Sequence, residues 1–103
     1  MRVLGVDLGE RRIGLALSDP TGTLATPLPT LVRRAGKRVP LAKIEELARE
    51  HGVEQLVFGL PLDLAGSEDE WCAAVRASGN ALATRLGIPV AFVDERKIGR
   101  AHV

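Results

Sequence analysis

Two apolar segments near the N-terminus, separated by a tight connection, constrain the fold of this chain most. Arg2–Leu8 (RVLGVDL) and Arg12–Ser18 (RIGLALS) are rich in branched residues and are typical of two strands of a hairpin. Side chains alternate along a strand, so each segment has one face of small residues. We expect this face, with Gly5, Asp7, Gly14 and Ala16, to be more open than the face with Leu4, Val6, Ile13 and Leu15.

The rest of the chain indicates three further strands separated by helices. Thr23–Val32 contains two prolines, which cannot donate ladder hydrogen bonds, and so predicts an edge strand. Gln55–Leu60 and Pro89–Val93 are apolar and predict buried strands. The order β-β-β-α-β-α-β combines an antiparallel hairpin with parallel later strands. The sequence therefore predicts an α/β fold, a mixed sheet with helices packed on its faces.

End signals and apolar spacing predict the two helices. Pro40 suits the start of the first helix and Gly52 its C-terminal cap. Its core face should contain Leu41, Ile44, Leu47 and Ala48. The second helix should begin with a capping box of Ser67 and Glu70 and end at Gly87. Its core face should contain Trp71, Val75, Ser78, Leu82 and Leu86.

Length and composition narrow the function classes. At 103 residues the chain is one domain, since domains commonly have about 100–200 residues. An aromatic content of 3% argues against a binder that stacks single-stranded bases. With a net charge of +1, only a local basic patch could meet nucleic acid. The absence of a long apolar run or a signal peptide predicts no membrane association, and the single Cys72 fits a reducing cytoplasm. The oligomeric state cannot be read from the sequence.

Asp7 most strongly indicates a functional site. A carboxylate within an apolar strand is unusual, because burial of an unpaired charge is costly. Flanking small residues would leave room for a metal ion and a phosphate. The alternative is a structural role, in which Asp7 accepts hydrogen bonds from the turn at Gly9–Arg11.

Other charged residues could join Asp7. Asp94 and Glu95 follow the last strand, where ligand sites of α/β sheets gather, and carboxylate oxygens are ligands that Mg²⁺ prefers. Arg11 and Arg12 are candidates for phosphate contact. The basic segment that follows the third strand could contact phosphates or simply be solvated: Arg33, Arg34, Lys37 and Arg38. Acidic residues before the second helix are more simply explained as favourable charge at a helix N-terminus: Glu68, Asp69 and Glu70.

Three motifs together resemble the YqgF/RuvX family, also called Holliday junction resolvase-like. They lie in Val3–Asp19 (with GVDLGERRIGLALSD at its heart), Phe58–Ser67 (FGLPLDLAGS) and Val93–Arg96 (VDER), in the order and at the spacing of the family. The resemblance implies an RNase H-like fold and a nuclease that depends on Mg²⁺ or Mn²⁺. It implies a cytoplasmic role in maturing the 5′ end of pre-16S ribosomal RNA, in ribosome biogenesis. Resolution of branched DNA in recombination and repair is the alternative.

The resemblance also implies roles for individual residues. Asp7 matches the acid of the first strand, and Asp94, Glu95 and Arg96 match the DER motif of the family. Asp7, Asp94 and Glu95 are then the catalytic candidates, with Asp7 and Asp94 as metal ligands. Arg96 joins the two hairpin arginines as a contact to nucleic acid. In the loop after the fourth strand, Asp63 stands where the family commonly has Asn, and Ala65 replaces a more polar residue.

The C-terminal residues depart from the family pattern. We expect an incomplete nuclease domain in residues 1–96 and a non-native tail in residues 97–103, since Ile98–Val103 can be encoded by a common sequencing adapter. The terminal helix of the fold, and a further acid that the family carries there, would then be missing. Such a chain should be inactive and marginally stable.

Two other function classes stay open. The pattern D-L-G-x-x-x-x-G at Asp7–Gly14 also resembles the phosphate-binding hairpin of actin-like ATPases and sugar kinases, which need a second domain to enclose a nucleotide. A non-catalytic module that binds nucleic acid or the ribosome is the other alternative. Metal-dependent cleavage separates a nuclease from a binder, and competition with ATP separates a kinase from both.

Overall fold

The computed structural model describes residues 1–9, 11–18, 25–33, 39–61 and 69–94. The elements within them follow the expected order β-β-β-α-β-α-β. The strands are β1 (Val3–Leu8), β2 (Arg12–Ser18), β3 (Ala25–Val32), β4 (Gln55–Leu60) and β5 (Val90–Asp94). The helices are α1 (Leu41–Glu50) and α2 (Glu70–Leu86).

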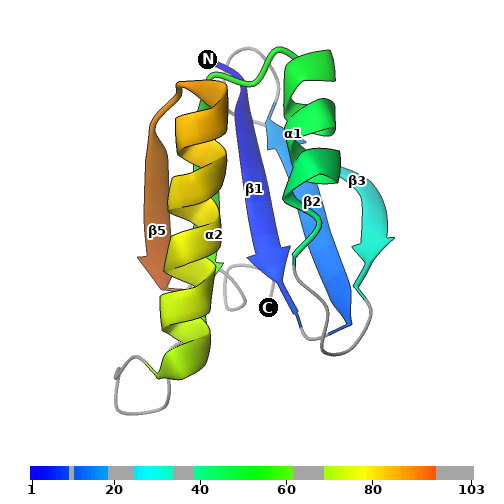
Figure 1. Ribbon diagram of the computed structural model, residues 1–103. Helices are drawn as coiled ribbons and strands as arrows, with labels where there is room; N and C mark the ends of the chain where they lie inside the picture. The colour runs from blue at the N-terminus through cyan, green and yellow to red at the C-terminus, as the bar shows by residue number, and fades with distance from the viewer. Residues whose placement is uncertain (10, 19–24, 34–38, 62–68, 95–103) are drawn as a thin grey trace.

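The strands form one mixed sheet in the order β3-β2-β1-β4-β5. The first strand of the chain lies at its centre, antiparallel to β2 and parallel to β4. The strand with two prolines, β3, lies at an edge, as predicted from its inability to donate at Pro27 and Pro29. The strands β1, β4 and β5 are parallel, so their carboxyl ends lie at the same end of the sheet (Figure 1).

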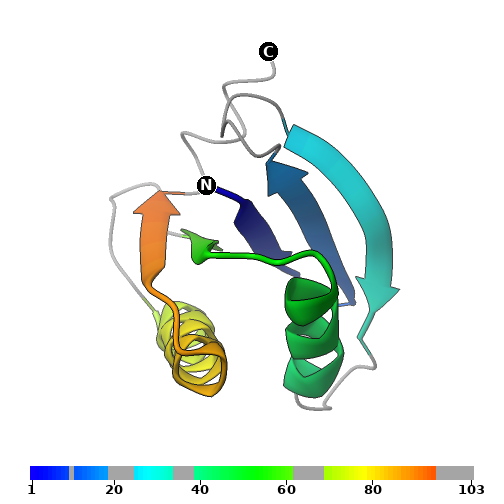
Figure 2. The same ribbon diagram turned by 90° about the horizontal axis from the view of Figure 1, so that it is seen from above.

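Both helices pack on the same face of this sheet (Figure 2). The face beneath them carries the core side chains of the strands, which are 9% exposed or less: Leu4, Val6, Leu8, Ile13, Leu15, Leu17, Leu56, Phe58 and Leu60. Burial of this apolar area is the main force that holds the layers together. Among the described residues, no helix covers the other face.

Helix α1 is oriented by two buried residues, Ile44 and Ala48, which lie on the predicted face. Pro40 occupies the N-cap position, one residue before the first helical residue. Gly52 follows the helix with a φ of 63°, the left-handed region that glycine adopts without strain. Gly52 was read correctly from the sequence, whereas the helix begins one residue later than the predicted start at Pro40.

Helix α2 differs from its predicted orientation and start. Its buried residues are Cys72, Val75, Gly79 and Leu82, so Val75 and Leu82 lie on the predicted face, whereas Cys72 and Gly79 take the core positions expected for Trp71 and Ser78. Gly79 lies against two rings, because a β-carbon there would be 2.8 Å from Cε1 of Phe92 and 3.3 Å from Cδ1 of Phe58. Packing of these rings sets the rotation of the helix.

The N-cap of α2 is Asp69, and the predicted capping box was wrong. The Asp69 carboxylate accepts a hydrogen bond of 3.0 Å from the Cys72 amide, and Glu70 is the first helical residue. Ser67 lies outside the described residues. An aspartate serves as well as a serine at an N-cap, so residue type alone does not distinguish Asp69 from Ser67, two residues earlier.

Candidate functional site

Asp7 lies on the open face of the sheet, near the carboxyl end of β1. Its side chain is exposed, whereas its neighbours Val6 and Leu8 are only 3% exposed. The facing residue in β2 is Gly14, which is half-buried like Gly5 and Ala16. The predicted difference between the two faces of the hairpin is confirmed.

Small residues form the floor around this carboxylate. A β-carbon on Gly14 would lie 3.6 Å from the β-carbon of Asp7, and one on Gly5 would lie 3.7 Å from the carbonyl oxygen of Ala16. These are ordinary van der Waals distances, so alanine would fit at either glycine. Because Gly5 and Gly14 have no side chains, the sheet surface beside Asp7 has space for a phosphate or a hydrated cation.

The turn after β1 is closed at Gly9. Its amide donates a 2.9 Å hydrogen bond to the Arg12 carbonyl oxygen, and a β-carbon here would be 2.7 Å from that same oxygen. Backbone atoms cannot move aside as a side chain can, so this position requires glycine. The tight closure places Arg12 at the start of β2, directly after the turn.

Arg11 and Arg12 are both exposed. Arg12 shares the face of Gly14, two residues further along β2, because side chains alternate along a strand. It is therefore a diagonal neighbour of Asp7, at a separation of about 7–8 Å, within reach of a long side chain. One carboxylate and one guanidinium thus lie on the same surface.

Asp94, in contrast, lies on the opposite face of the sheet from Asp7. Val6, Phe58 and Phe92 form one row across β1, β4 and β5, and Phe92 contacts α2 at Gly79. Asp94 is two residues beyond Phe92 and shares its helix-covered face, while Asp7 is one residue beyond Val6. The described residues do not bring these two carboxylates onto one face.

The remaining site candidates lie outside the described residues: Glu95, Arg96, Asp63, Glu68, Arg34, Lys37 and Arg38. The tail at 97–103 also lies outside them. Among the residues that are described, no group of three or more His, Cys, Asp or Glu side chains is arranged to hold a metal ion. The described part of the site therefore supplies one exposed carboxylate, Asp7.

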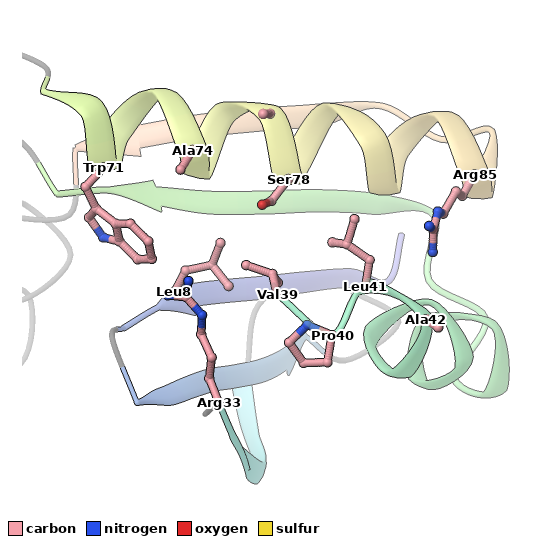
Figure 3. A pocket seen from close by; sticks show the side chains of 11 residues that line it. Leu8, Arg33, Val39, Pro40, Leu41, Ala42, Trp71, Ala74, Ser78 and Arg85 are labelled. Carbon is pink, nitrogen blue, oxygen red and sulfur yellow. The ribbon is translucent and has the colours of Figure 1, made fainter. Parts of the chain in front are cut away.

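A groove on the helix side of the sheet was not anticipated from the sequence. It has a volume of about 610 Å³ and lies over β1, beside α2 and the start of α1 (Figure 3). At one end, Leu8, Arg33 and Trp71 point toward one another. The Arg33 guanidinium lies 4.9 Å from the centre of the Trp71 ring. Trp71 is half-buried, with its ring against this cation.

Neither α1 nor α2 is long and apolar enough to cross a membrane. Cys72 packs in the core, because its side chain is fully buried and its thiol lies 3.4 Å from the Pro61 carbonyl oxygen.

The strand order with β1 at the centre, and the two helices on one face, define an RNase H-like fold. The fold aligns with Thermus thermophilus RuvC in complex with a Holliday junction substrate at a TM-score of 0.66 and 18% identity, over 98% of this chain and 69% of that one. The family model described as RuvX, Holliday junction resolvase, matches residues 1–99. The chain belongs to this family.

Curated relatives agree with this assignment. A protein of Moorella thermoacetica, whose name gives it as a candidate pre-16S rRNA nuclease, is 47% identical over 96 residues, which is 93% of this chain and 68% of the relative. A protein of the same name from Pelotomaculum thermopropionicum is 40% identical over 96 residues, covering 93% and 62%. The chain thus spans about two thirds of the length of these relatives.

More distant structures share the fold alone. YeaZ from Pseudomonas aeruginosa aligns at a TM-score of 0.55 and 20% identity, over 91% of this chain and 43% of that one. A Listeria monocytogenes protein, named for N-acetylmannosamine kinase activity, aligns at a TM-score of 0.53 and 18% identity. The alignment covers 91% of this chain and 35% of that one. The resemblance of the hairpin to that of sugar kinases therefore reflects a shared sheet.

Proposed function

We propose that this protein is a metal-dependent endonuclease that hydrolyses phosphodiester bonds of structured nucleic acid, in the 5′-end processing of pre-16S rRNA. The observation that carries the proposal is the exposed Asp7 on a floor of small residues, with Arg12 beside it. The names of relatives at 40–47% identity support the choice of substrate. Such an enzyme would work in the cytoplasm, where ribosomes are assembled.

The chemistry of the proposal divides between an acidic and a basic side. Asp7 would hold a divalent cation, Mg²⁺ or Mn²⁺, which supplies charge stabilisation of the attacking and leaving oxygens when it is bound. Arg11 and Arg12 would bind phosphates on either side of the scissile bond, together with Arg96. A carboxylate oxygen is the ligand type that these hard cations prefer, so Asp7 fits the role.

The second acid of the site is proposed from the DER segment, Asp94 and Glu95. Asp94 shares the helix-covered face, so we expect it to contribute less than Asp7 to a bound cation. Glu95 lies outside the described residues and is proposed from the family motif alone. Of the two metal ligands proposed from the sequence, Asp7 and Asp94, we therefore keep Asp7 as the main one.

The C-terminal boundary of the nuclease domain is also proposed. The family match ends at residue 99, close to the proposed boundary after Arg96. We propose that residues 97–103 do not belong to the nuclease domain, and that the part of the relatives beyond this region completes it. If so, the chain of 103 residues and a chain completed with that part should differ in nuclease activity.

Cleavage should be measured in two chains, residues 1–103 and a chimera that continues after Arg96 with the C-terminal part of the Moorella thermoacetica relative. With Mg²⁺, the chimera should remove the 5′ extension of a pre-16S rRNA fragment, and a chelator should abolish the activity. Asp7→Asn should abolish cleavage while leaving the fold intact. Glu46→Gln, which removes an exposed carboxylate from α1, is the matched control. Cleavage by Asp7→Asn near the wild-type rate would refute the proposal.

Resolution of a four-way DNA junction is the second candidate function, favoured by the description of the matching family model. The same chimera should be offered such a junction in parallel with the RNA. Faster cleavage of the junction would replace the RNA substrate in the proposal. Binding of either substrate without cleavage would instead indicate a non-catalytic module.

A further inference from the structure

Arg33 connects three parts of the chain that are far apart in the sequence. It follows β3 directly, and its amide donates a 2.6 Å hydrogen bond to the Arg11 carbonyl oxygen. Its Nη1 donates a 3.4 Å hydrogen bond to the carbonyl oxygen of Gly9. Its guanidinium also lies over the Trp71 ring, 4.9 Å from the centre. One residue therefore bonds the turn between β1 and β2 and contacts the first turn of α2.

The two carbonyl groups that Arg33 binds belong to the turn that presents Arg11 and Arg12. This turn is closed on its other side by the Gly9 amide, which bonds to the Arg12 carbonyl oxygen at 2.9 Å. Backbone groups in a turn at a sheet edge are otherwise left to water, and an unanchored turn samples several conformations. The contacts of Arg33 therefore restrict the backbone at Gly9 and Arg11.

The other anchor, Trp71, lies in the first turn of a helix that is fixed to the core by its buried residues. It follows the first residue of α2, after the cap at Asp69. The next residue, Cys72, and the residue one turn on, Val75, are both fully buried. A guanidinium at 4.9 Å lies within the distance of about 6 Å at which a cation attracts a ring. Figure 3 shows the Arg33 side chain reaching from the end of β3 toward this ring.

We propose that Arg33 is a positioning residue, which holds the turn from Gly9 to Arg12 against Trp71 so that Arg11 and Arg12 face nucleic acid beside Asp7. This role rests on the proposed function. Arg33 itself lines the groove on the helix side of the sheet, whereas Asp7 and Arg12 lie on the other face. A planar guanidinium can stack on a ring and donate in its own plane at the same time, which an ammonium cannot do.

Trp71 provides the variant that separates positioning from direct contact. Trp71→Leu removes no charge, so it leaves direct contacts between cations and phosphate unchanged. If Arg33 acts through the turn, loss of either partner should have the same effect, and loss of both should add nothing. Arg33→Lys keeps the charge but loses the planar stack, and it should resemble Arg33→Ala.

The experiment measures affinity for a structured RNA in Ca²⁺, together with amide hydrogen exchange, in the chain of 103 residues. Arg33→Ala, Arg33→Lys and Trp71→Leu should each weaken the affinity for RNA by about three- to tenfold, the size of coupling typical of two side chains in contact with each other. The affinity of the double variant Arg33→Ala/Trp71→Leu should equal that of the weaker-binding single variant. Arg49→Ala serves as the control, because it removes an equal charge from α1. Arg49 donates to the Arg85 carbonyl oxygen, at the end of α2 that is far from Trp71.

Hydrogen exchange reads the turn directly, without any nucleic acid. In Arg33→Ala, the Gly9 amide should lose protection, while the Leu56 amide, bonded to the Pro89 carbonyl oxygen at 3.0 Å, should keep it. Unchanged protection of Gly9 would overturn the proposal. So would wild-type affinity in Trp71→Leu together with weak binding in Arg33→Ala, because Arg33 would then contact phosphate itself. If neither the wild-type chain nor the chimera binds RNA or DNA, the proposed function fails and the role of Arg33 fails with it. Wild-type binding that Arg33→Ala leaves unchanged overturns the positioning role alone.

Discussion

Gly79→Ala tests how closely α2 packs against the strand that ends at Asp94. Ordinarily this change stabilises a helix interior by about 1 kcal/mol. Here the added β-carbon would lie 2.8 Å from Cε1 and 2.9 Å from Cζ of Phe92. It would also lie 3.3 Å from Phe58, which is fully buried. Both rings would have to shift, and overpacking of this kind costs about 1–3 kcal/mol.

The balance of the two effects is a net loss of roughly 1 kcal/mol, obtained by subtracting the helix propensity from the middle of the overpacking range. For a domain of this size the melting temperature should fall by about 4–8 °C. The assay is thermal unfolding followed by circular dichroism. Asn80→Ala, at the exposed neighbouring position of the same helix, should leave the melting temperature unchanged or raise it.

A second variant identifies the cause. If the Phe92 ring is the obstacle, Phe92→Leu should cost less stability in the Gly79→Ala background than in the wild-type chain, because both changes act on one contact. A melting temperature that rises in Gly79→Ala as much as in Asn80→Ala would refute the reasoning. It would show that Phe92 gives way at no cost, and that packing does not fix the rotation of α2.

Two further predictions concern the start of α2 and the end of β5. Asp69→Ala should lower the free energy of unfolding by about 1 kcal/mol in a urea titration, whereas Asp69→Asn, which can still accept from the Cys72 amide, should stay close to wild type; equal losses in both variants would contradict the capping role. In the chimeric nuclease, Asp94→Asn should reduce the cleavage rate less than Asp7→Asn, because Asp94 shares the helix-covered face; equal losses would show that both carboxylates reach the same cation.

Much of the fold could be predicted because its signals are local. Alternation of small and large residues in Arg12–Ser18 fixed both the strand and its buried face, and the prolines of β3 fixed its place at an edge. The rotation of α2 was missed because the burial of Gly79 depends on the rings of Phe58 and Phe92, which come from other strands.

The candidate site could be predicted only in part, for a similar reason. Asp7 could be predicted because it is a carboxylate within one apolar strand. The face on which Asp94 lies depends on the register between β4 and β5, in which Leu60 is paired with Asp94. The contacts of Arg33 with Gly9, Arg11 and Trp71 join separate segments of the chain, and no spacing in the sequence encodes them.

The central position of β1 has a consequence for the order of folding during synthesis. Val6 pairs with Leu15 on one side of β1 but with Phe58 on the other. The β1–β2 hairpin can close as soon as it is made, while the other edge of β1 waits for a strand that is synthesised much later. Pairing over such a separation is intrinsically slow, and an open strand edge invites pairing with other chains. Asp7 and Arg12 are therefore brought together early, and slow synthesis between β2 and β4 should favour aggregation through β1.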